Sequence, residues 1–173
     1  GFVGIQFHDQ LLAGQLGQSN SAVGGARLGL DFDYYWGLEA RFAYSNPDTT
    51  IPGIPAVRDS SHNYYVDLNL MYYPWGDSRW RPYFSVGLGS GTYRFQDNGI
   101  SVSDSGLRIP LAMGLKYYYS PWFTLRFDAQ YASTFLSDNF DAQNEFMLNF
   151  GAEVRFGGSR QSYFPWHSGA VFW

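Results

Sequence analysis

Alternation of apolar and polar residues is the feature that most constrains how this chain can fold. Near the end of the chain, in NFGAEVRFGG, Phe150, Ala152, Val154 and Phe156 alternate with glycine and charged residues. A two-residue period places the two sets of side chains on opposite faces of a β-strand. The same pattern predicts eight strands, around residues 3–7, 26–35, 38–44, 64–72, 84–91, 107–117, 123–131 and 149–156.

Short and long connections alternate between the predicted strands. The short ones are Trp36-Gly37 and the segments 74–79 and 120–122, whereas LAGQLGQSNS, SNPDTTIPGIPAVRDSS, QDNGISVSDS and SDNFDAQ are longer and polar. Bacterial outer-membrane barrels have short periplasmic turns and longer extracellular loops. The sequence therefore predicts an all-β fold, an eight-stranded antiparallel up-and-down transmembrane β-barrel with this arrangement of connections.

Aromatic residues gather at the predicted short-turn end. They are Tyr34, Trp36, Tyr72, Trp75, Trp80, Tyr117, Tyr119 and Trp122. Aromatic residues favour strands in general, but aromatic girdles also mark the levels where a barrel crosses a membrane interface. Because these residues cluster at one end of successive strands, we predict an aromatic girdle at one interface.

The placement of charges predicts which face of the strands meets the membrane. The polar-face charges that we predict to form an interior network are Arg27, Asp31, Glu39, Arg41, Asp67, Arg108, Lys116, Arg126, Asp128, Glu153 and Arg155. The central spans of the apolar faces carry no charge, and an Arg or Lys that faces lipid at mid-depth costs about 2–4 kcal/mol. Only 15% of the residues are charged and 20% are aromatic, yet no stretch approaches the roughly 20 apolar residues of a membrane helix. We therefore predict charges inside the barrel and lipid outside.

Within this network we expect Glu39, Asp67, Lys116, Arg126 and Asp128 to lie at similar depth and to pair across the lumen. An eight-stranded barrel is just wide enough for its own side chains to fill, and an unpaired charge in that space is strongly disfavoured. The predicted function is a structural, envelope-stabilising or surface-interaction barrel with a plugged lumen. The alternatives are a small ion-conducting pore and a soluble lipocalin-like carrier.

The last predicted strand carries a second pattern. Asn149 is followed two residues later by Gly151, then by apolar Val154 and the aromatic Phe156. This spacing resembles the C-terminal β-signal that the outer-membrane assembly machinery recognises.

The chain resembles the OmpA-type N-terminal transmembrane barrel, in the wider group that includes the OmpX and Ail-like barrels. The resemblance covers residues 1–157 and rests on WGLEARFAY, LMYYPW, YFSVGLGSGTYRF, GLKYYYSP, TLRFDAQY and GAEVRFG, in that order. It implies a location in the outer membrane of a Gram-negative bacterium, a periplasmic N-terminus, and roles in envelope integrity, adhesion or contact with host and phage. It also implies partners, namely outer-membrane lipids and lipopolysaccharide, the assembly machinery, and proteins or host surfaces that reach loops 46–61 and 96–106.

The family also has an exchangeable gate of charged residues inside the barrel. Glu39 and Arg126 match two of the gate positions. Lys116 stands where the family has an acid, and Asn69 stands near the position of a Lys. The resemblance therefore implies a rearranged set of gate pairs.

Other functional classes find little support in the sequence. The three histidines, His8, His62 and His167, are scattered, and the chain has no Cys, so we predict no metal site, no cofactor and no catalytic residue. A lipid A-modifying enzyme is the less favoured alternative. The net charge of −4 and the absence of a basic stripe predict no nucleic-acid partner. Residues 158–173 form an aromatic-rich C-terminal segment, which we expect to be a periplasmic tail or linker.

Overall fold

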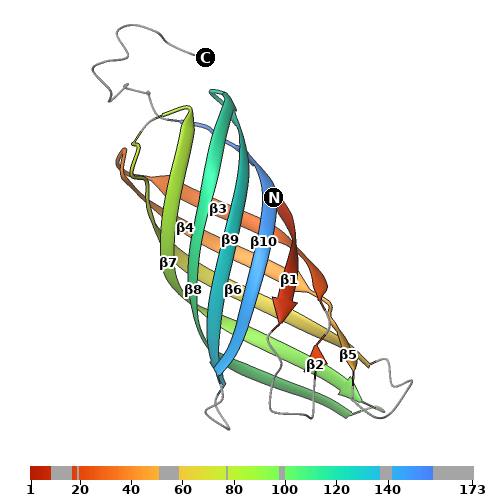
Figure 1. The fold of residues 1–173 in the computed structure, drawn as a ribbon. Coiled ribbons are helices and arrows are strands. Elements are labelled where there is room, and N and C mark those ends of the chain that lie inside the picture. The colour runs from red at the N-terminus through yellow and green to blue at the C-terminus, as the bar shows by residue number, and fades with distance from the viewer. Residues whose placement is uncertain are drawn as a thin grey trace, which may run out of the picture.

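The computed structural model describes residues 1–8, 17–18, 20–50, 59–76, 78–97, 100–136 and 142–157. Its strands are β1 (Phe2–His8), β2 (Gly17–Gln18), β3 (Ser21–Asp31), β4 (Trp36–Ser45), β5 (Asp48–Thr50), β6 (Asp59–Tyr72), β7 (Trp80–Asp97), β8 (Ile100–Ser120), β9 (Phe123–Leu136) and β10 (Ala142–Val154). Eight of these strands form the barrel, and the short β2 and β5 form a small ladder beside the loop end of β6 (Figure 1). The predicted tail 158–173 lies outside the described residues.

The barrel closes because every long strand has two antiparallel neighbours. β3, β4, β6, β7, β8, β9 and β10 pair successively in chain order, and β1 pairs with both β3 and β10. The closing register runs from Phe2 opposite Gly151 to His8 opposite Glu145. Closure leaves no long strand with an unpaired edge, and it confirms the predicted eight-stranded up-and-down barrel.

The two faces of the barrel differ in polarity as the alternation predicts. Along β4, exposed and buried residues alternate without interruption. Apolar side chains such as Leu28, Leu68 and Phe127 are exposed on the outer wall, whereas Glu39 and Arg126 are buried inside. Inward-facing charge and outward-facing apolar side chains are the arrangement of a barrel that spans a membrane.

One predicted connection is wrong in its details. We expected Trp36-Gly37 to join the second and third strands, but these two residues begin β4, and the turn lies earlier. The carboxylate of Asp33 accepts a hydrogen bond from the Tyr34 amide at 2.5 Å, and the Asp33 amide donates to the Trp36 carbonyl at 3.2 Å. An aspartate that bonds its neighbouring backbone in this way promotes a turn.

The prediction of a long loop at QDNGISVSDS is also wrong. β7 and β8 pair as far as Asp97 opposite Ile100, so most of this segment is a hairpin rather than a loop. The sequence contains the signal for it, because Asn98-Gly99 is a preferred two-residue hairpin connection. The predicted strands of this pair were too short at both ends.

Among the described residues, no helix is long and apolar enough to cross a membrane.

Candidate functional site

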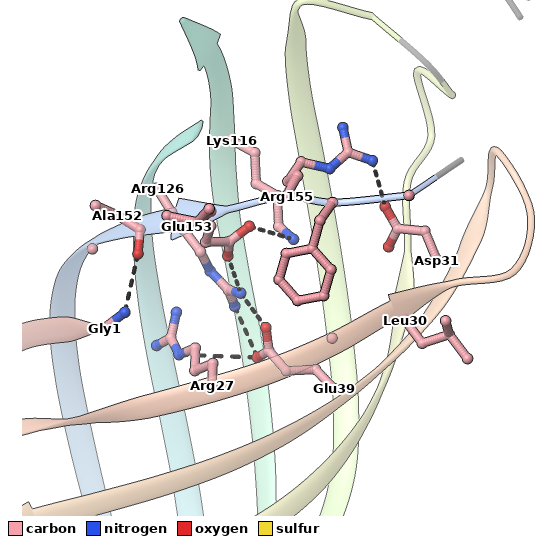
Figure 2. Close-up of a pocket in the computed structure, with 15 residues that line it drawn as sticks. Gly1, Arg27, Leu30, Asp31, Glu39, Lys116, Arg126, Ala152, Glu153 and Arg155 are labelled. Atoms are coloured by element: carbon pink, nitrogen blue, oxygen red, sulfur yellow. Dashed lines mark hydrogen bonds and ion pairs between the residues drawn. The ribbon is translucent and has the colours of Figure 1, made fainter. Parts of the chain in front are cut away.

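Charged side chains fill the lumen at the short-turn end of the barrel. Arg126, near the start of β9, donates from Nη1 to the Glu39 carboxylate on β4 and from Nη2 to Glu39 Oε1 at 3.2 Å. Its Nη1 also lies 3.0 Å from Glu153 Oε1 on β10, and its Nε lies 3.1 Å from Asp128 Oδ2. One buried guanidinium therefore contacts three carboxylates from three strands. Figure 2 shows two of them, Glu39 and Glu153.

Two further cations complete this group. Arg27 on β3 donates two hydrogen bonds to Asp128, at 2.7 and 3.1 Å. Lys116 on β8 lies 3.2 Å from Glu153 Oε2. We call this set the Arg126 cluster; its members are Arg27, Glu39, Lys116, Arg126, Asp128 and Glu153. With three cations and three carboxylates, the Arg126 cluster has no net charge.

Three further charges, Arg81, Asp31 and Arg155, lie next to the Arg126 cluster at the short-turn end. Arg81 Nη1 donates to Asp31 Oδ2 at 2.6 Å, and Arg155 Nη2 lies 3.6 Å from the same oxygen. Asp31 and Arg155 are partly exposed, so this pairing is weaker than the buried ones. A cavity of about 470 Å³ lies here, lined by residues of both charge signs, including Arg27, Glu39 and Lys116 (Figure 2).

A second charged group lies in the lumen toward the loop end. Arg108 on β8 donates from Nη1 to the Glu145 carboxylate, and its Nε lies 3.3 Å from Asp67 Oδ1. Arg41 contacts the other oxygen of Asp67 at 3.0 Å. We call these four residues the Arg108 cluster. Tyr65 and Tyr93 donate to Glu145 Oε1 at 2.8 and 2.9 Å.

We expected five charged residues to lie at similar depth, and this expectation is wrong for Asp67. Glu39, Lys116, Arg126 and Asp128 belong to the Arg126 cluster, but Asp67 belongs to the Arg108 cluster. Residues on neighbouring strands share a depth according to register, which the alternation of one strand does not reveal.

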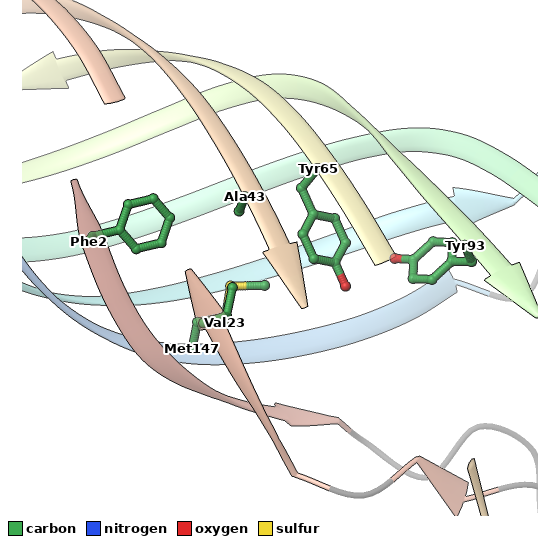
Figure 3. Close-up of a cluster of buried hydrophobic side chains, with 6 residues drawn as sticks. All are labelled: Phe2, Val23, Ala43, Tyr65, Tyr93 and Met147. Carbon is green, nitrogen blue, oxygen red and sulfur yellow. The ribbon is translucent and has the colours of Figure 1, made fainter. Parts of the chain in front are cut away.

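A buried aromatic ring connects the two clusters. Phe2 on β1 is 5% exposed, and its ring lies 4.2 Å from the guanidinium carbon of Arg27 and 4.9 Å from that of Arg41. Cations placed over a ring face are attracted by its quadrupole. The ring belongs to a buried cluster with Val23, Ala43, Tyr65, Tyr93 and Met147, which we call the Phe2 cluster (Figure 3).

Glycines on both neighbouring strands make room for this ring. A Cβ atom on Gly25 would lie 2.8 Å from Phe2 Cε1, and a Cβ atom on Gly151 would lie 3.0 Å from Phe2 Cβ. Side chains do not pack that closely, so Gly25 on β3 and Gly151 on β10 form a slot for Phe2.

The predicted girdle residues lie together at the short-turn end. Trp36 packs on Tyr72 with ring centroids 5.0 Å apart, and Trp80 packs on Tyr117 at 4.5 Å. All except Tyr34 and Tyr117, which are half-buried, are exposed. Their role at a membrane interface stays a prediction.

The four residues of the predicted β-signal divide between the two faces. Asn149 points inward and donates to Asp128 Oδ1 at 2.9 Å, while Gly151 lines the Phe2 slot. Val154 and Phe156 are exposed. Recognition of this segment by the assembly machinery stays a prediction.

Sequence reasoning missed several buried polar groups of the lumen, among them Glu145, Arg81 and Tyr83. Glu145 lies between the predicted loop SDNFDAQ and the strand that we placed at 149–156, and Arg81 and Tyr83 precede the strand start that we placed at residue 84. Tyr83 accepts a hydrogen bond from Arg126 Nε at 2.6 Å. For β10, the signal was available in the alternation of Gln143, Glu145 and Met147 with their neighbours.

Within the described residues, no group of three histidines, cysteines, aspartates and glutamates is placed to hold a metal ion. His62 contacts the Tyr44 hydroxyl through Nδ1 at 2.8 Å. The side chains of His8 and His167, and of the neighbouring Ser60 and Ser61, lie outside the described part of the chain.

Comparison with known proteins places the chain among outer-membrane barrels. The family described as outer membrane protein beta-barrel domain matches residues 1–156. Neisserial surface protein A has a TM-score of 0.64 and 14% identity, with 90% of this chain and 95% of that chain covered. The N-terminal β-barrel domain of OprF from Pseudomonas aeruginosa has a TM-score of 0.58 and 16% identity, with 90% and 97% covered.

A third solved structure is similar. Ail, the attachment invasion locus protein of Yersinia pestis, has a TM-score of 0.54 and 20% identity, with 90% of this chain and 95% of that chain covered. At these identities the likeness shows a common fold. No curated protein matches the chain.

Proposed function

Because the chain belongs to the outer membrane protein beta-barrel domain family, and is thus an integral protein of the outer membrane of a Gram-negative bacterium, we propose that it is a non-enzymatic barrel whose lumen is closed by charged side chains. Its role is to stabilise the envelope and to present its extracellular loops to partners. The expected partners are outer-membrane lipids and lipopolysaccharide, the assembly machinery, and a protein or host surface that contacts segment 46–61.

The observation that carries this proposal is the pairing of charge inside the barrel. Arg126 and Arg108 each contact carboxylates of at least two other strands. Such contacts tie distant parts of the wall together across a space that has no room for a wide channel. Breaking a buried pair leaves an uncompensated charge, so the pairs resist opening.

Planar-bilayer recording tests the proposal. We expect the wild-type protein to show no large, steady conductance. Arg126→Ala removes the centre of the Arg126 cluster and should raise conductance or destabilise the barrel, whereas Arg79→Ala, in an exposed turn, should do neither. Heat-modifiable gel migration reports whether each variant is folded.

A small ion-conducting pore is the second candidate. It is favoured by the cavity of about 470 Å³ at the periplasmic end, whose lining carries charges of both signs and would hold water. Large, steady wild-type conductance in the same recordings would contradict the closed lumen and support the pore.

A further inference from the structure

Positive charge is in excess at the short-turn end of the lumen. We use the name mouth group for the Arg126 cluster together with Arg81, Asp31 and Arg155. The mouth group holds five cations and four carboxylates, and each carboxylate already contacts two of the cations. Within the mouth group, one positive charge is therefore left without a counter-charge of its own.

Arg155, which follows β10, is the most weakly paired cation of the mouth group. Its closest carboxylate contact, from Nη2 to Asp31 Oδ2, is 3.6 Å long, whereas Arg81 Nη1 lies 2.6 Å from the same oxygen. Its Nη1 is buried and donates no hydrogen bond to any described residue. The guanidinium carbon lies 4.7 Å from the ring centroid of Tyr118. Arg155 is thus positioned by an aromatic ring and keeps one donor for another acceptor.

The cavity of about 470 Å³ lies beside this donor. Arg155 and Lys116 both line it, and Figure 2 shows Arg155 directed toward Asp31 and Lys116 toward Glu153. Gly29 lines it as well, and a Cβ atom there would meet only the Leu38 carbonyl oxygen, at 3.7 Å. The side chains of Asp31, Glu153 and Arg155 are 22–29% exposed, so a solute can reach them. Pockets for small molecules have volumes of about 300–1,000 Å³.

We propose that this cavity binds a small organic anion through its carboxylate group, with Arg155 as the main contact. A carboxylate brings the single negative charge that the mouth group lacks. It also matches a guanidinium in shape, because the two planar groups form charge-assisted hydrogen bonds that are frequently bidentate. Lys116 is the second cation within the cavity and has three donors on its ammonium group.

A monocarboxylate fits the cavity better than an inorganic phosphate ion does. Asp31, Glu39 and Glu153 also line the cavity. A phosphate group with a charge of about −1.5 to −2 would exceed the one available positive charge and would be repelled by these carboxylates. Leu30 and Val154 add apolar surface to the same lining, against which a short apolar group of an organic acid would pack.

The test measures propionate binding to the full chain. The protein is refolded in an uncharged maltoside detergent, without other carboxylates or phosphate, and propionate is titrated while saturation-transfer difference NMR follows binding. We expect a saturable signal from the wild type and roughly tenfold weaker affinity for Arg155→Gln, which loses charge-assisted hydrogen bonds. Arg155→Lys keeps the charge without the planar fork and should be intermediate. Heat-modifiable gel migration verifies that each variant is folded.

A second variant should change the affinity in the opposite direction. Asp31→Asn removes the carboxylate that competes for Arg155 and raises the excess charge of the mouth group, so it should bind propionate several-fold more tightly. Propionamide, which has nearly the same shape but no charge, should not saturate any of the variants.

Arg79→Gln is the matched control. Arg79 also lies over a tyrosine ring at the short-turn end, with its guanidinium carbon 5.2 Å from the centroid of Tyr117. It is exposed and is not among the residues that line the cavity. This variant should bind propionate with the affinity of the wild type.

Four results would overturn the proposal. They are an unchanged affinity in Arg155→Gln, a loss in Arg79→Gln equal to that in Arg155→Gln, saturation by propionamide at propionate concentrations, and displacement of propionate by an equal concentration of inorganic phosphate. The last result would assign the cavity to an inorganic ion. Because none of these readouts depends on conductance, the outcome is separate from that for the closed lumen.

Discussion

Truncation of Phe2 should destabilise the barrel far more than truncation of a phenylalanine on the outer wall. Phe2 is 5% exposed and contacts Arg27 and Arg41, whereas Phe150 on β10 is 54% exposed and faces outward. A Phe→Ala change in a packed site costs about 3–5 kcal/mol, and the cation–π contacts add about 0.5–2 kcal/mol. Phe150→Ala replaces protein contacts with lipid, which is equally apolar, and should cost about 1 kcal/mol.

Urea unfolding in phospholipid vesicles, followed by tryptophan fluorescence, measures both free energies of unfolding. The two variants match in chemistry and lie on neighbouring strands, since Phe2 pairs with Gly151. The expected difference between them is roughly 2.5–6 kcal/mol once the cation–π contacts are included. Equal destabilisation would refute the reasoning, because it would mean that the lumen repacks freely around the missing ring.

Phe2→Ala should also change what fills the lumen. The space that it leaves is bordered by the guanidinium groups of Arg27 and Arg41. A cavity with charged walls takes up water, whereas an apolar cavity stays dry. We therefore expect faster ion release from vesicles that contain Phe2→Ala than from vesicles that contain Phe150→Ala.

Three further predictions concern the wall, the Arg126 cluster and the β-signal. Leu68→Arg places a charge on the exposed apolar wall and should cost about 2–4 kcal/mol, seen as a loss of the heat-modifiable folded form in lipid. Arg126→Ala should cost roughly 3–5 kcal/mol in the same urea titration, because it leaves Glu39 and Glu153 without their shared partner. Phe156→Ala should slow assembly in cells, measured by pulse-chase protease protection, while the free energy of unfolding of refolded protein changes by no more than about 1 kcal/mol.

The sequence predicts the wall of this barrel better than its interior. Leu68 and Asp67 are adjacent, and their alternation alone places one outside and the other inside, as the structure confirms. The alternation does not tell which strand positions share a depth. Asp67 contacts Arg108 rather than Arg126 because the pairing register, which spans several strands, decides the level at which each side chain enters the lumen.

The ends of the strands are also predicted poorly from the sequence, because the predicted strands are too short. Arg81 stands beside Pro82, and Glu145 follows the polar Asn144, so the alternation is weaker at both residues than in the middle of the strands. Beyond the lipid level both faces of a strand can be polar, because neither face meets hydrocarbon. The hydrophobic pattern therefore marks the membrane-spanning part of each strand and loses the parts that extend past it.

The slot around Phe2 has a consequence for the timing of assembly. Its two walls, Gly25 and Gly151, belong to β3 and β10, and β1 stands between these strands at the seam that joins the first strand to the last. The slot is incomplete until that seam forms. Joining the first and last strands is therefore the step that also seats the ring in the lumen. A barrel whose seam is still open lacks its inner barrier as well. We expect any transient leak during insertion to end abruptly, in one event, when the wall is completed.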